Sequence, residues 1–169
     1  MDVSDLLTEA YDRLPDLVRA AVDGLTPEQL RWAPGREANS IGWLVWHLTR
    51  VQDHHIADLL DAEQIWVSGN WADRFGLAAD PDNTGYGHSP EQVAAVLPES
   101  AQALLDYYEA VAARTGPFLA GLKPADLDQI VDESWDPPVT LGVRLVSIVD
   151  DDVQHAGQAA YVRGLLAAR

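Results

Sequence analysis

Apolar residues recur at spacings of three and four along most of this chain, a pattern that predicts amphipathic helices. From Ser4 to Val22 the repeat places leucines, valines and alanines on one face, and Pro15 is expected to kink or restart that helix. A second long helix is expected from Asn39 or Ser40 to about Gln64, in the most apolar part of the chain.

Helix-capping signals indicate where further helices begin. Thr26 and Ser89 each precede a proline and stand three residues before a glutamine, as in a capping box, so a short helix follows Thr26. A third long helix should run from Ser89 to about Leu122, with Pro98 early in it and Gly116-Pro117 bending or breaking it. Thr140 is expected to cap a fourth helix that reaches Leu166.

Between the second and third helices, residues Val67 to His88 are rich in Gly, Asn, Asp and Pro and show little periodicity. A loop of this length is often functional. We find no alternating pattern that predicts a strand, no internal repeat and no linker. The sequence therefore predicts an all-α protein, a four-helix bundle with one long irregular loop, formed by a single domain of residues 1–169.

Composition narrows the function classes. The formal charge is −16, from 11 Lys and Arg against 27 Asp and Glu, and no basic cluster exists, which argues against nucleic acids and anionic membranes as partners. The chain contains no cysteine, which excludes a catalytic cysteine and thiolate metal sites. The acidic start lacks the features of a signal peptide, and no apolar run approaches the length of a bilayer span, so we expect a cytoplasmic protein.

Candidate chemistry lies on two of the predicted helices. Asp151 and His155 stand four residues apart, so a helix places both side chains on one face, one turn from each other. His47 lies in the apolar stretch of the second helix, where a polar side chain needs a partner. If those helices are neighbours, two imidazoles and a carboxylate could hold zinc, nickel or ferrous iron. The ordinary alternatives are a surface Asp/His contact and a core histidine bonded to a carbonyl.

The other histidines fit this site less well. His54 is two turns, about 10 Å, beyond His47 and is too far away to bind the same ion. We interpret His54 and His55 as outer or surface residues, with His55 pointing elsewhere, and His88 as structural or exposed.

Two segments of the chain resemble a known family. The stretch "NSIGWLVWHLTRVQDHH" together with the later "VTLGVRLVSIVDDDVQHAGQAAYVRGLL" is similar to the DinB/YfiT-like superfamily, whose members include bacillithiol- and mycothiol-dependent transferases and maleylpyruvate isomerase. The resemblance covers nearly the whole chain and implies a metal held by His47, Asp151 and His155. Many relatives carry histidine where this chain has Asp151, and a carboxylate there favours a harder ion.

The resemblance also implies an activity. A divalent metal would activate a low-molecular-weight thiol cosubstrate. The thiol would then either be transferred to a small electrophile or catalyse the isomerisation of that electrophile. Trp43 and Trp46 would contact the bound molecules. Several relatives form homodimers, although the sequence shows no dimer patch. Two alternatives stay open: a helical module that binds a metal or ligand without catalysis, and a metal-dependent hydrolase.

Overall fold

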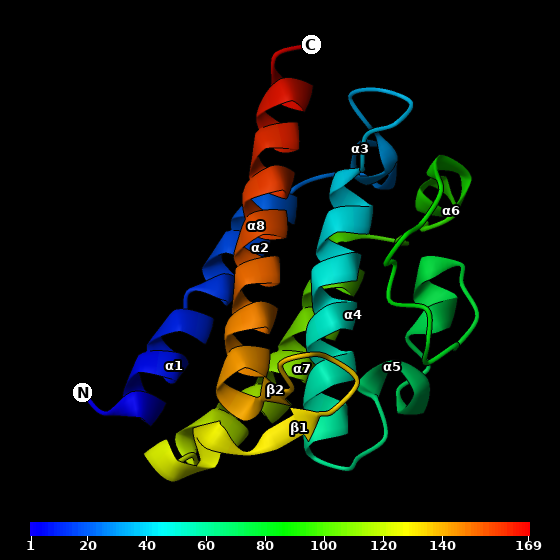
Figure 1. The fold of residues 1–169 in the computed structure, drawn as a ribbon. Helices are drawn as coiled ribbons and strands as arrows, with labels where there is room; N and C mark the ends of the chain where they lie inside the picture. The colour runs from blue at the N-terminus through cyan, green and yellow to red at the C-terminus, as the bar shows by residue number, and fades with distance from the viewer.

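The computed structural model describes all residues from 1 to 169, and most of them are helical (Figure 1). The all-α expectation is confirmed, with one small addition, an antiparallel pair of short strands that no alternating pattern predicted. The elements are α1 (Val3–Tyr11), α2 (Leu14–Val22), α3 (Pro27–Arg31), α4 (Ile41–Leu59), α5 (Ile65–Ser68), the 3-10 helix η1 (Ala72–Phe75), α6 (Pro90–Ala94), α7 (Ala101–Ala120), the 3-10 helix η2 (Pro124–Asp128), β1 (Ile130–Asp132), β2 (Val139–Thr140) and α8 (Leu141–Ala167).

The predicted capping residues begin their helices. The Thr26 side chain accepts a hydrogen bond from the backbone of Gln29 at the start of α3, and Ser89 does the same with Gln92 at α6; both are complete capping boxes. Thr140 caps α8, which ends at Ala167, one residue beyond the predicted end. These starts were predictable because a cap is a contact between residues three positions apart.

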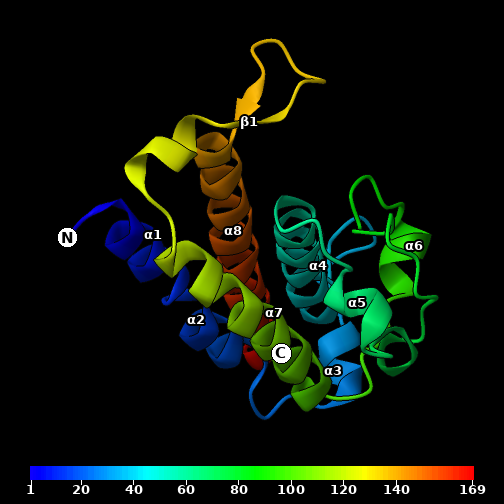
Figure 2. The same cartoon turned by 90° about the horizontal axis from the view of Figure 1, so that it is seen from below.

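The helix that carries His47 lies at the centre of the molecule. α4 packs along α8 more extensively than any other two elements pack, and α7 contacts α4, α1 and α2. In Figure 2, α1 and α2 lie beyond α8, whereas α5 and α6 lie on the opposite side, beyond α4. Because neighbours cover it on several sides, 14 of the 19 residues of α4 are buried, including His47 and Arg50.

The prediction of one helix from Ser89 to Leu122 is wrong. α6 ends at Ala94, and the segment that joins it to α7 pairs with η1: Leu97 N–H donates to Phe75 O and Glu99 N–H donates to Arg74 O, both at 2.9 Å. Pro98 packs so closely on Gly42 of α4 that a Cβ at Gly42 would lie 2.8 Å from the proline Cγ. Contacts with distant residues therefore override the local helical pattern.

Three further expectations differ from the structure in detail, and a fourth, the restart of a helix at Pro15, agrees with it. α4 ends at Leu59 rather than near Gln64, and the irregular region contains α5 and η1. Pro15 restarts a helix as expected, as the second residue of α2. Pro117 neither ends nor divides α7, which continues past it to Ala120. None of the helices combines the length and the apolar composition that a bilayer-spanning segment needs.

Candidate metal centre

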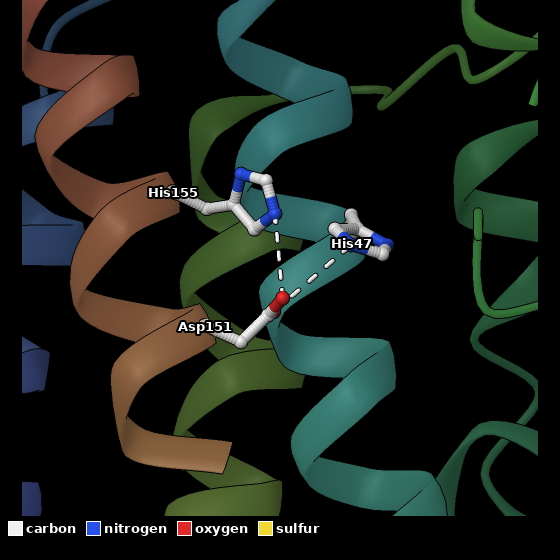
Figure 3. A group of neighbouring side chains, drawn as sticks. All are labelled: His47, Asp151 and His155. Carbon is white, nitrogen blue, oxygen red and sulfur yellow. Dashed lines mark ion pairs between the residues drawn. The ribbon is translucent and has the colours of Figure 1, made fainter. Parts of the chain in front are cut away.

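The contact between α4 and α8 brings the three predicted ligand residues together (Figure 3). His47 Nε2 lies 4.0 Å from Asp151 Oδ2, and His155 Nε2 lies 3.5 Å from Asp151 Oδ1. One ligand atom from each residue falls within 4.8 Å of the other two. His47 comes from the buried face of α4, and Asp151 and His155 come from successive turns of α8. The juxtaposition thus depends on the packing of two helices that are about 100 residues apart in sequence.

Hydrogen bonds on the far side of each imidazole set its tautomer. His47 Nδ1–H donates to the carbonyl oxygen of Thr84 at 2.6 Å, and His155 Nδ1–H donates to Gln158 Oε1 at 3.1 Å. Each neutral ring therefore presents the lone pair of Nε2 toward Asp151. Histidines that bind metals commonly hold their other ring N–H in this way.

The candidate ligand atoms of the cluster are suited to binding a cation. Asp151 Oδ2 is buried without any hydrogen-bond partner, and an unpaired buried acceptor is unfavourable by about 1–3 kcal/mol. Burial lowers the pKa of His47, which keeps that ring neutral. Burial also lowers the pKa of His155, but the hydrogen bond and charge of Asp151 outweigh it and raise the pKa overall. The cluster thus attracts positive charge, and two imidazoles with one carboxylate form a set that leaves open positions on a divalent ion.

A cavity of about 410 Å³ adjoins the cluster, within the size range of ligand pockets. Its walls come from α4, α8 and the loop before α6, and most of the side chains are polar. The lining residues are His47, Val51, His54, His55, Asp82, Thr84, Tyr86, Ser147, Ile148 and Asp151. A small molecule in this cavity would therefore contact two of the three candidate ligands.

The loop that supplies Thr84 is fixed by a buried arginine. Arg50 of α4 is fully buried; its Nε donates to Asn83 O at 3.1 Å and its Nη2 donates to Pro81 O at 2.9 Å. Gly85 has a φ of +93°, and a Cβ there would lie 2.8 Å from His47 Nδ1. Only glycine lets the loop backbone pass so close to the imidazole.

The two tryptophans that were predicted to contact bound molecules lie outside the cavity lining. Trp46 is completely buried and Trp43 is 6% exposed, and neither lines the cavity. Trp43 stacks on His47 with ring centroids 4.6 Å apart, and its Nε1–H donates to His88 Nδ1 at 3.2 Å. His88 Nε2–H donates in turn to Asn83 Oδ1 at 2.8 Å. His88 is therefore structural, as one of the two readings of the sequence proposed, and joins Trp43 to the loop.

Sequence reasoning missed two histidines of the cavity and the backbone contact of Thr84. His54 and His55 were interpreted as outer or surface residues, but both line the cavity and are half-buried. Their positions seven and eight residues after His47 place them on its side of the helix, which was the available signal. Thr84 contributes to the cluster through its backbone carbonyl. Because every residue has such a carbonyl, the residue type does not reveal this contact.

Burial makes His55 a pH-sensitive element of the fold. Burial, and secondarily the positive charge of Arg144, lowers the pKa of His55 to about 4, whereas an unfolded histidine titrates near 6.5. The stability that the neutral ring contributes is therefore complete above about pH 6.5 and is lost as the pH falls toward 4.

We expect His55→Gln, which is uncharged at every pH, to reduce the fall in Tm between pH 7 and pH 4.5. Thermal unfolding of both proteins across this range measures the effect. Equal falls in Tm would contradict the burial of a neutral His55.

Comparison with known proteins supports the resemblance found in the sequence. The sequence profile of the Mycothiol-S-transferase family matches residues 6–168. A similar solved structure is the crystal structure of a conserved protein of locus from Enterococcus faecalis, which is 34% identical and has a TM-score of 0.91. That match covers 100% of this chain and 99% of the other. No curated protein matches this chain. Since the family match extends over nearly every residue, the chain belongs to the mycothiol S-transferase family, a DinB/YfiT-like family.

Proposed function

We propose that this protein is a metal-dependent thiol S-transferase built on a four-helix bundle of the DinB/YfiT-like type. Its cosubstrate is a low-molecular-weight thiol, mycothiol for this family, and its second substrate is a small electrophile. The same chemistry serves isomerisation when the thiol adds to the substrate and later departs.

The proposed metal dependence is supported mainly by the surroundings of Asp151. The carboxylate of Asp151 lies between two imidazole nitrogens, and its buried Oδ2 has no hydrogen-bond donor. When both imidazoles are neutral, three acceptors converge without a donor, and a divalent cation would stabilise them because each then gains a partner. The hydrogen bonds of both imidazoles to Thr84 and Gln158 hold the rings in the required orientation.

The roles of the residues follow. His47, Asp151 and His155 would hold the ion, which supplies a lowered pKa for a coordinated thiol. The chain has no cysteine, so the attacking sulfur must come from the cosubstrate. The polar cavity beside Asp151 would receive the electrophile and keep it next to that sulfur.

The proposal is tested by measuring metal content and thiol consumption on the same samples. Protein loaded separately with Zn²⁺, Ni²⁺ or Fe²⁺ should retain about one ion per chain after desalting. It should then consume mycothiol in the presence of an electrophile such as monobromobimane. His47→Ala should lose both the ion and the reaction, because one of three protein ligands is removed.

Two outcomes would contradict this function in different ways. Stoichiometric metal with no thiol consumption across a panel of electrophiles would favour a binding module. Turnover of an ester or amide without added thiol would favour a hydrolase that uses bound hydroxide.

A further inference from the structure

His54, which is outside the candidate ligand set, has a defined tautomer. The Gln64 side-chain nitrogen lies 3.2 Å from the carbonyl oxygen of Pro81 and 3.0 Å from His54 Nδ1. A carbonyl only accepts hydrogen bonds, so the amino end of the Gln64 amide must face Pro81. That amino group has a second hydrogen, which it donates to His54 Nδ1. The hydrogen of the neutral His54 ring therefore belongs on Nε2.

His54 lies where its Nε2–H can bond to a molecule in the cavity. His54 lines the same cavity as His47 and Asp151, and Gln64 is its only hydrogen-bond partner in the chain. The Nε2–H has no acceptor of its own, whereas unpaired donors in a cavity usually bond to water or a ligand. Two helical turns, about 10 Å, separate His54 from His47 along α4, so His54 can contact a molecule bound beside the cluster without binding the ion.

We infer that His54 donates a hydrogen bond from Nε2 to an oxygen atom of the electrophile, and that the preferred electrophiles are epoxides and α,β-unsaturated carbonyl compounds. This inference rests on the proposed S-transfer. In both substrate classes an oxygen near the attacked carbon gains negative charge during the reaction, and a fixed donor aimed at that oxygen stabilises it. An alkyl halide has no such oxygen and gains nothing from His54.

The reaction with an epoxide balances without any redox partner. The thiol loses its proton to solvent, the sulfur forms a bond to a ring carbon, and the bond between that carbon and the oxygen breaks. The electron pair of the broken bond stays on the oxygen, which takes a proton from water to give a β-hydroxy thioether. His54 transfers no proton in this reaction and acts only as a hydrogen-bond donor.

The experiment compares two electrophiles in three proteins that carry the same metal. With a small epoxide, His54→Leu should lower kcat/KM at least about tenfold, which corresponds to about 1.4 kcal/mol of one hydrogen bond. His54→Gln places an amide N–H near the former position of Nε2 and should recover most of the loss. With a small alkyl bromide, all three proteins should react within about twofold of one another, which also shows that the variants are folded and hold metal.

A second measurement does not depend on activity. Long-range ¹⁵N–¹H spectra of the metal-free protein should show His54 with its hydrogen on Nε2, and Gln64→Leu should weaken that preference. An Nδ1–H tautomer in the native protein would overturn the inference. So would an equal effect of His54→Leu on both electrophiles, or no effect on either, while the native protein still transfers the thiol. If the native protein transfers the thiol to neither electrophile, the proposed function itself fails.

Discussion

Arg50→Met is expected to lower the free energy of unfolding by about 3–5 kcal/mol, the usual effect of removing one member of a buried ion pair. Arg50 Nη1 lies 3.5 Å from Asp53 Oδ2, and both side chains are completely buried. The hydroxyl of Tyr107 donates to the same Asp53 oxygen at 2.8 Å and accepts from Arg50 at 3.3 Å. Without the guanidinium, Asp53 would remain as a buried carboxylate with no positive charge to offset it. Urea unfolding at neutral pH measures the change.

A matched control exists on the surface. Arg13 pairs with Glu9 at 2.8 Å, one helical turn away, but both side chains are more than half exposed. Arg13→Met should therefore change stability little, because exposed ion pairs contribute little. The double variant Arg50→Met with Asp53→Asn should recover part of the loss, since it removes the unpaired charge and keeps an acceptor for one of the two backbone N–H groups, those of Ile65 and Trp66, that bond to Asp53. Equal effects of Arg50→Met and Arg13→Met would contradict the role of this pair.

The buried pair also links the core to the candidate site. Arg50 holds the loop through the carbonyls of Pro81 and Asn83, and the next residue, Thr84, accepts the hydrogen bond from His47. Asp53 anchors the start of α5 from the same turn of α4. Arg50 therefore fixes a loop segment that has no regular hydrogen bonding of its own, and Asp53 fixes the start of α5.

Local signals explain what could be predicted from the sequence. The caps at Thr26, Ser89 and Thr140 and the shared helical face of Asp151 and His155 each involve residues three or four positions apart. The meeting of His47 with this pair required the packing of α4 on α8, which no spacing encodes. From the sequence, the metal site could therefore be predicted only on the condition that the two helices are neighbours.

Long-range backbone contacts explain what could not be predicted. The segment between α6 and α7 leaves the helical path because Leu97 and Glu99 bond to the backbone of η1. The long loop was recognised from its composition, but the contact of Thr84 with His47 was not. The signal nearest to it was Gly85, whose importance becomes clear only when a Cβ is placed against the imidazole.

Asp151→Asn is expected to weaken the binding of a divalent ion at least about 100-fold, because even partners that only orient metal ligands contribute 10- to 100-fold. The substitution keeps the shape of the side chain and removes the negative charge that lies between His47 and His155. Asp150→Asn is the matched control: it is the same change one residue earlier, at an exposed side chain that accepts only from Gln154. Zn²⁺ should raise the Tm of the native protein and the Asp150 variant but not that of the Asp151 variant, since an ion stabilises only a fold that binds it. A Zn²⁺-dependent rise in Tm that survives Asp151→Asn, or is lost in Asp150→Asn, would show that the ion binds elsewhere on this acidic chain.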